Sequence, residues 1–109
     1  MQTTRRTHIR RLVLDVLKPH QPRIDILALQ ISALKGIDSV NIIRTETDRN
    51  TEGIIVTIVG DDIQFSTVEE TLRDNGCSIH SVDEVVAGEH IIKTVRLPKE
   101  EDTLDAINE

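Results

Sequence analysis

The feature of this sequence that most constrains its fold is the order in which two kinds of apolar pattern alternate along a short chain. Four runs rich in Ile, Val and Thr have the composition of β-strands, and they cover His8 to Leu17, Ile37 to Asp48, Gly53 to Gly60 and Cys77 to Val86. Two other stretches, Arg23 to Lys35 and Ser66 to Asn75, carry apolar residues at helical spacing. The predicted order is therefore strand, helix, strand, strand, helix, strand.

Local signals set the ends of these elements. Pro19 and Pro22 end the first strand; Pro22 also suits the first turn of the following helix, and Gly36 suits its C-terminal cap. The stretch Ser66-Thr67-Val68-Glu69 fits a capping box at the start of the second helix. Between the two middle strands, the polar residues Arg49 to Glu52 predict a hairpin with a four-residue loop.

The two halves of the chain are related by a weak repeat, because Gly36 and Gly76 each mark the change from helix to strand. Two strand-helix-strand units predict an α+β, ferredoxin-like βαββαβ sandwich, in which a four-stranded antiparallel sheet carries both helices on one face. The first and last strands are then neighbours, and the other face of the sheet is open.

A chain of 109 residues has the length of one domain, which we expect at residues 8–97. Residues 1–7 are predicted to be a flexible basic N-terminus, and residues 98–109 an acidic, disordered tail. A further short strand is expected at Ile91 to Leu97, after a bend at Ala87 and Gly88.

Composition excludes several classes of protein. One Phe, no Tyr and no Trp leave almost nothing to stack on a base, and a net charge of −6 argues against any nucleic-acid partner. No apolar run is long enough to cross a membrane. The single Cys77 excludes an internal disulfide, and the N-terminus shows no secretory signal, so a cytoplasmic location is expected.

Apolar residues also occur where the predicted fold would expose them. Ile26 and Leu29 lie opposite the core-facing side of the first helix, and Val13 lies on the open side of the first strand. Val82 and Val86 join the same open side if His80 and Glu84 point the same way. Scattered surface apolar residues are ordinary, but a contiguous patch favours an interface. We therefore expect a homo-oligomer, with a cyclic ring as one arrangement, in contact through Val13, Ile26, Leu29 and Val82.

Carboxylates interrupt two of the predicted strands. Asp15 lies in the first strand and the pair Asp83 and Glu84 in the last, where each needs a partner, solvent or a cation. Because these strands are expected to be neighbours, Asp15 can meet Asp83 or Glu84 and bind a hard cation such as Ca²⁺ or Mg²⁺. The alternative is ordinary ion pairing with nearby Arg or Lys side chains.

Near the hairpin, Glu46 and Asp48 share one face of a strand and could chelate a cation together, although the sequence does not match a calcium-binding EF-hand. A solvated polar hairpin end is the alternative. The four His residues and Cys77 lack the spacing of a zinc site, and no catalytic motif or site for an organic cofactor is recognisable. The sequence thus predicts a protein that is not an enzyme.

Three stretches resemble a known family: Leu14 to His20, Glu46 to Asp48 and, most specifically, Ser81-Val82-Asp83-Glu84-Val85-Val86-Ala87-Gly88. The family is an uncharacterised, mainly archaeal domain of unknown function, numbered two hundred and eleven, and the likeness spans residues 8 to 93. A departure is Gln21, where an acidic residue is expected. The resemblance implies a ferredoxin-like fold, oligomeric assembly and cation binding, and it points at Asp15, Glu46, Asp48, Asp83 and Glu84.

The leading hypothesis from the sequence is a homo-oligomeric binding or regulatory protein whose carboxylates hold divalent cations at or near subunit contacts. The alternative is a small-molecule effector-sensing domain of the amino-acid-binding regulatory type, since such domains place effectors between paired ferredoxin-like units. The identity of the ligand differs between the two hypotheses, whereas the fold is the same.

Overall fold

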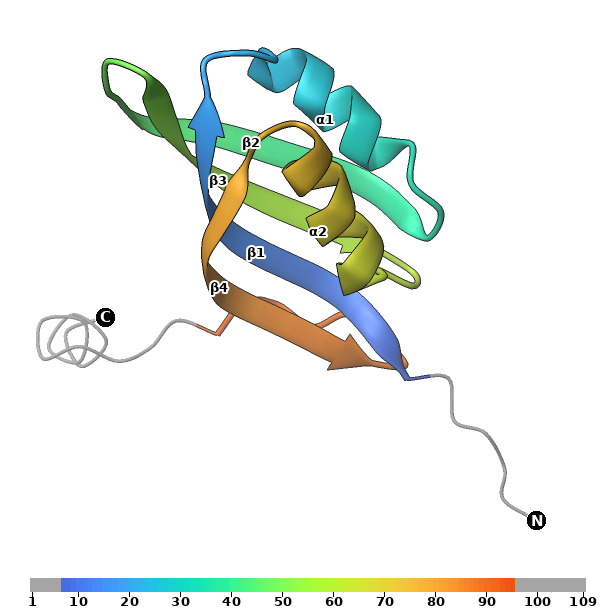
Figure 1. Ribbon diagram of the computed structural model, residues 1–109. Coiled ribbons are helices and arrows are strands. Elements are labelled where there is room, and N and C mark those ends of the chain that lie inside the picture. Colours follow the sequence, from blue (N-terminus) through green and yellow to red (C-terminus); the bar gives the residue numbers. More distant parts are fainter. Residues whose placement is uncertain (1–6, 96–109) are drawn as a thin grey trace, which may run out of the picture.

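A four-stranded antiparallel sheet and two helices make up the computed structural model, which describes residues 7–95. The elements follow in the order β1 (His8–Pro19), α1 (Ile24–Ser32), β2 (Ile37–Thr47), β3 (Thr51–Gly60), α2 (Phe65–Asp74) and β4 (Ser78–Gly88), as Figure 1 shows. This βαββαβ order confirms the predicted ferredoxin-like α+β fold.

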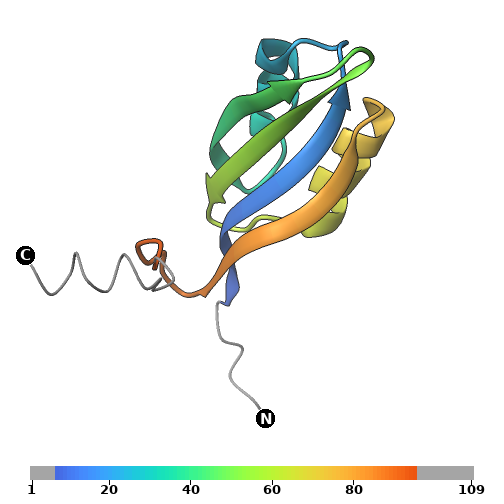
Figure 2. The ribbon, with the colours of Figure 1, turned by 90° about the vertical axis from the view of Figure 1, so that its left-hand side faces the viewer.

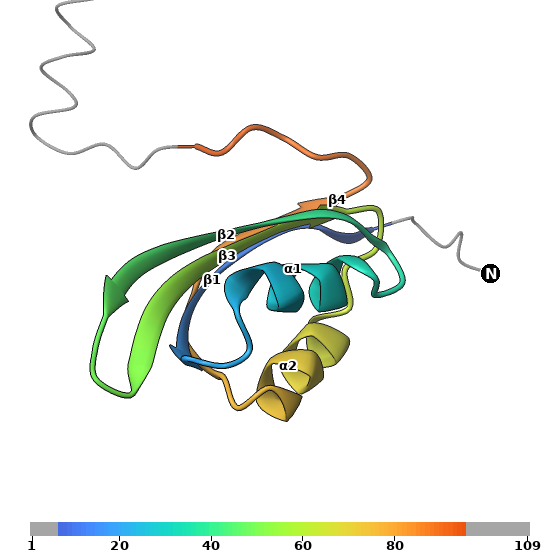
Figure 3. The same cartoon turned by 90° about the horizontal axis from the view of Figure 1, so that it is seen from above.

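The sheet has the strand order β2-β3-β1-β4, so β1 and β4 are neighbours as expected. Figure 2 shows the sheet with both helices behind it, and Figure 3 shows both helices below the same face. We call the opposite face, which neither helix covers, the open face. It carries most of the residues discussed below.

The core lies between the sheet and the helices. Residues 12–18 of β1 and 52–58 of β3 alternate, so that every second side chain there points to the helices and is buried. The main buried residues are Leu12, Leu14, Val16, Leu27, Ile31, Ile54, Val56, Ile58, Val68 and Leu72. Burying each such side chain contributes about 1.5–3 kcal/mol, and Cys77 packs into the same cluster as a small apolar residue.

Helix α1 is shorter than the sequence pattern predicts. It begins at Ile24 and ends at Ser32, so Pro22 lies before the helix and not in its first turn. The chain then makes a turn to Gly36, whose φ of +87° favours glycine. A Cβ at Gly36 would lie 2.0 Å from the backbone oxygen of Asp62. Glycine is therefore also required here because the connection between α1 and β2 passes close to the connection between β3 and α2.

The capping-box prediction for helix α2 is wrong. The helix begins at Phe65, one residue earlier than expected, and Gln64 is its N-cap without a side-chain capping bond. Ser66 is therefore already inside the first turn, where its hydroxyl cannot act as an N-cap. The end of the helix is as predicted, because Asn75 is the C-cap and Gly76 has a φ of +78°.

Two other local predictions need correction. The hairpin loop has three residues, 48–50, and the backbone amide of Asp48 donates to the carbonyl of Thr51 over 2.7 Å, so Glu52 belongs to strand β3. The expected strand at Ile91 to Leu97 is absent over residues 91–95. Residues 96 and 97, the predicted tail at 98–109 and residues 1–6 of the predicted N-terminal tail (1–7) lie outside the described residues.

Candidate functional site

The open face combines apolar and charged side chains. Val13, Asp15 and Leu17 alternate along β1 with the buried residues, and the register pairs Asp15 with Ile55 of β3, which in turn pairs with Ile43 of β2. Leu17 is 46% exposed and Ile43 is 57% exposed. An apolar surface of this extent, without a helix to cover it, is the first candidate for an interface.

The segment that follows β4 crosses above part of the open face. Figure 3 shows it running on the side of the sheet opposite the helices. Between this segment and the sheet lies an open groove of about 630 Å³, lined by Arg11, Val13, Thr57, Asp83, Glu84, Val85, Val86, Ile92, Lys93, Thr94 and Val95. One direct bond crosses the groove, since the Thr94 hydroxyl lies 3.3 Å from a Glu84 carboxylate oxygen.

Three of the five predicted acidic residues have neighbours that satisfy them. Arg11 Nε donates to Glu84 Oε1 over 2.6 Å, and the two side chains are mostly shielded from solvent. The Ser81 hydroxyl donates to Asp83 over 2.7 Å, and the backbone amide of Arg49 donates to Asp48 over 2.9 Å. Ion pairing, the alternative weighed for the strand carboxylates, is therefore what the structure shows for Glu84.

Asp15 does not meet Asp83 or Glu84. The register pairs Asp15 with Ser81 and pairs Val13 with Glu84, because shifts in register leave Asp83 and His80 without direct partners on β1. Such irregularities place extra residues in one strand and re-aim its side chains. No local pattern of residues marks these irregularities, and the predicted contact between the carboxylates is wrong.

Asp15 and Glu46 instead line a smaller groove together with His80, and Gly53 leaves room between them. The side chains of Asp15 and Glu46 make no hydrogen bond or ion pair with another described residue. Nevertheless, no group of three or more His, Cys, Asp or Glu side chains gathers at one point within residues 7–95. Since Ca²⁺ and Mg²⁺ take six or more oxygens, the five acidic residues of one chain do not fit a complete cation site.

The predicted interface residues lie on two surfaces. On α1, Ile26 is 40% exposed and Leu29 is 66% exposed, which matches the expected second apolar side of this helix. Val13 lies on the open face. Val82 differs from the expectation, because the register pairs it with Leu14 of the helix-facing row. Val86, predicted for the same side, pairs with Arg11 and lines the larger groove.

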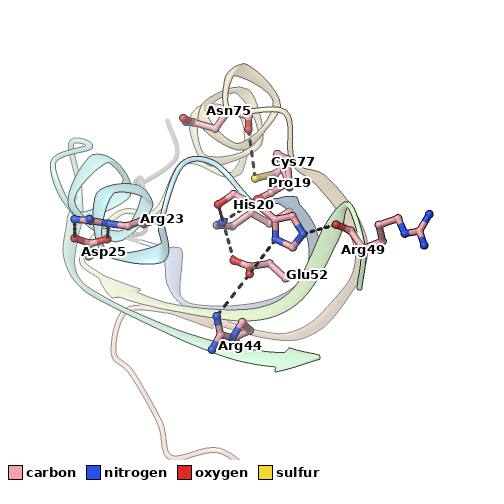
Figure 4. A network of polar contacts seen from close by, with 10 residues as sticks. Pro19, His20, Arg23, Asp25, Arg44, Arg49, Glu52, Asn75 and Cys77 are labelled. Atoms are coloured by element: carbon pink, nitrogen blue, oxygen red, sulfur yellow. Dashed lines mark hydrogen bonds and ion pairs between the residues drawn. The ribbon is translucent and has the colours of Figure 1, made fainter. Parts of the chain in front are cut away.

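A buried ion pair at the hairpin end of the sheet was missed by the sequence analysis. Lys18 Nζ lies 2.7 Å from Glu52 Oε1, and both side chains are buried. Figure 4 shows the Glu52 carboxylate with His20 and Arg44 beside it. The ammonium also donates to the backbone oxygens of Pro19 and His20 over 2.8 Å and 3.3 Å. With its three hydrogens donated, Lys18 joins the loop after β1 to strand β3 and has no hydrogen left for an anion.

More charges surround the same carboxylate. Arg44 Nη1 and His20 Nδ1 each lie 3.8 Å from Glu52 Oε2. The hydrogen bond from Lys18 lowers the pKa of Glu52 below its usual range, and this effect outweighs the desolvation that would raise it. At Cys77, burial raises the pKa of the thiol, which favours the uncharged form in the core.

One sequence signal could have revealed this pair. Leu12, Leu14 and Val16 predict a buried row with period two, and the next member of that row is Lys18. The predicted strand ends at Leu17 and the predicted loop includes Glu52, so neither Lys18 nor Glu52 belongs to the predicted buried rows. Extending each strand by two residues makes them members of facing buried rows.

With this geometry in place, comparison with known proteins is informative. Residues 10–101 match the model of the family DUF211, described as "Uncharacterized ArCR". The chain belongs to this family. The uncharacterised protein MJ0319 of Methanocaldococcus jannaschii is 49% identical over 92 residues, which are 84% of this chain and 95% of the relative. The resemblance stated from the three sequence stretches is thereby confirmed, and the family carries no described activity.

Within the described part of this family member, neither helix is long and apolar enough to cross a membrane.

Proposed function

We propose that this protein is a non-catalytic, homo-oligomeric binding protein whose copies associate through the open face of the sheet, with the outer side of α1 as a second contact. The observation that carries the proposal is the open face itself. It displays Leu17, Ile43 and Val13 on a layer that the two helices leave uncovered. Apolar faces of this kind are normally buried against another layer.

The size of the open face supports this assignment. Four strands spaced about 4.8 Å apart, each with roughly ten residues rising about 3.3 Å, span roughly 600 Å² before side-chain relief is added. A stable interface buries about 800 Å² on each partner. The open face therefore supplies most of the area that a specific contact between copies needs, and Leu29 with Ile26 adds to it.

Divalent cations enter this proposal only as bridges between copies. Asp15 and Glu46 line one groove of the open face without a partner among the described residues, and a second chain would be required to supply the missing oxygens. The expected ion is Ca²⁺ or Mg²⁺, because carboxylates are hard ligands.

Native mass spectrometry of the protein purified without chelator tests the proposal, because it reports the number of subunits and any bound ion together. We expect a discrete oligomer, and Leu17→Lys should weaken it at least 10-fold by placing a charge on the open face. Thr67→Lys, a matched change at an exposed position of α2, should leave the oligomer intact. A wild-type protein that is monomeric at micromolar concentration would refute the proposal.

A second candidate is an effector-sensing domain. The observation that favours it is the groove of about 630 Å³ with Arg11 in its wall, a volume in the range of small-molecule sites. The dialysed protein would then show a rise in melting temperature with one member of a panel of free amino acids, and Arg11→Met would abolish that rise. The absence of any shift across the panel would exclude this candidate.

A further inference from the structure

The chain segment after β4 has the composition of a strand but pairs with none. Residues 91–95, which we call the arm, contain Ile91, Ile92, Thr94 and Val95, all β-branched. Ile92 is 62% exposed and Val95 is 76% exposed. Within the described chain, the backbone of the arm makes no hydrogen bond, and the Thr94 hydroxyl is its one polar contact. The arm is thus a strand-forming segment without a partner.

The path of the chain keeps the arm away from its own sheet edges. Gly88, the last residue of β4, has a φ of +145°, a conformation that side-chain-bearing residues rarely adopt. From there the arm runs above β1, β3 and β4, and the groove of about 630 Å³ separates it from them. It therefore lies over a face of the sheet and not along an edge where its amides could pair.

The two edges of the sheet differ in their ability to accept another strand. Strand β4 has an irregular register with three shifts against β1, and irregular edges of this kind discourage strand addition. Strand β2 pairs regularly with β3 over residues 39–44 and carries one charge there, Arg44, and no proline. The outward amides and carbonyls of these six residues form a free, regular edge, which we call the β2 edge.

We propose that the arm of one copy adds as a fifth strand to the β2 edge of a second copy. This inference rests on the proposed homo-oligomer and names the contact that joins its members. Exposed apolar side chains are available on both sides, since Ile43 of the β2 edge would lie beside Ile92 or Val95 of the arm. In β-strand addition the main-chain bonds supply affinity and alternate side chains supply specificity.

Charge supports the same pairing. Lys93 is exposed in the centre of the arm and has no ion pair with a described residue. Along strand β2, Asp38 precedes the β2 edge and Glu46 follows it, and neither residue has an ion-pair partner among the described residues. Reciprocal exchange of arms gives a dimer, and exchange from each copy to the next gives a ring. Either arrangement places one arm on every β2 edge.

Proline substitutions in the full-length chain test the inference. In a strand, only every second backbone amide points to the partner strand. Ile92→Pro and Lys93→Pro, made as two separate variants, therefore remove one amide from each of the two alternating sets. We expect at least one of them to raise the dissociation constant of the oligomer 10-fold or more by sedimentation. Ile92→Val keeps the amide and the β-branching, and it should leave assembly unchanged. Since the arm lies outside the sheet of its own chain, all three variants should keep the far-ultraviolet circular dichroism of the folded domain, and the proline variants should lose at most the small signal of one five-residue strand.

A cross-linking experiment provides a second, independent measurement. Chains with Asn41→Cys are mixed with chains with Lys93→Cys and treated with a short bifunctional thiol reagent, while Cys77 stays buried and protected. The inference predicts a covalent pair formed between the two variants. Thr67→Cys mixed with Lys93→Cys is the matched control, and it should give none.

The outcomes separate the inference from the function on which it rests. A monomeric wild-type protein would overturn both. An oligomeric wild type that tolerates both prolines and gives no cross-link between positions 41 and 93 would overturn the arm contact alone and leave association through the open face standing. Weakened assembly of a proline variant together with the specific cross-link would establish the arm on the β2 edge.

Discussion

The buried ion pair between Lys18 and Glu52 gives the sharpest prediction about stability. Replacing Lys18 by Met keeps most of the side-chain volume but removes the ammonium 2.7 Å from the Glu52 carboxylate. That carboxylate stays buried, and the next basic groups, the Arg44 guanidinium and the His20 ring, lie 3.8 Å away. The variant therefore leaves a buried negative charge without its main partner.

The expected loss for Lys18→Met is about 3–5 kcal/mol, because removing one member of a buried pair exposes the full desolvation cost of the other. Adding Glu52→Met removes that uncompensated charge. The double variant still lacks the two bonds to the Pro19 and His20 oxygens, which are worth about 1 kcal/mol each, so it should lie about 2 kcal/mol below the wild type. The two substitutions are therefore expected to be strongly non-additive.

Urea unfolding followed by far-ultraviolet circular dichroism measures these differences, since the chain has no Trp or Tyr to report by fluorescence. Protein concentration must be equal in all samples, because assembly contributes to the apparent stability. A loss below about 1 kcal/mol for Lys18→Met, or a double variant as unstable as the sum of the two single ones, would refute a buried, coupled pair.

Two other predictions follow from the same structure. Because the pKa of Glu52 is lowered on folding, its ionised carboxylate contributes to the free energy of unfolding in full above the ordinary pKa of 4.5, and this contribution is lost as the pH falls below that value. The stability difference between wild type and Glu52→Gln should therefore shrink on acidification. A difference that stays constant in unfolding curves measured at acid pH would contradict this. Gly36→Ala should lower the free energy of unfolding by about 3 kcal/mol or more, because a positive φ is combined with a backbone atom 2.0 Å from the new Cβ. Gly76→Ala should lower it by about 1–2 kcal/mol, because the new Cβ meets only the Pro19 ring, at 3.3 Å. Equal melting temperatures of the two Ala variants would be evidence against the close approach at Gly36.

The sequence predicts the architecture well because each element is marked by a pattern that depends on local residues alone. Period-two runs define β1 and β3, and the apolar face with Leu27 and Ile31 defines α1. Handedness then leaves one arrangement in which both helices share a face of the sheet. No long-range information is needed for this part of the structure.

The candidate site is less predictable because it depends on register and on strand ends. The shifts that leave Asp83 and His80 without direct partners are set by how two distant strands fit, and no local pattern marks them. The burial of Glu52 follows from the length of a hairpin loop, and a change of one residue there decides between solvent and core. Both errors concern residues whose environment is fixed by segments far away in the chain.

The pairing of His8 with Gly88 places the first residue of β1 directly beside the last residue of β4. A linker of a few residues would close residues 8–88 into a ring of covalent bonds, and the three-residue loop at 48–50 offers an exposed position for new chain ends. Such a circular permutant would retain every strand neighbour and every core contact while omitting the arm. The fold and the arm are therefore separable modules, so sequence drift in the arm can alter assembly without altering the domain that carries it.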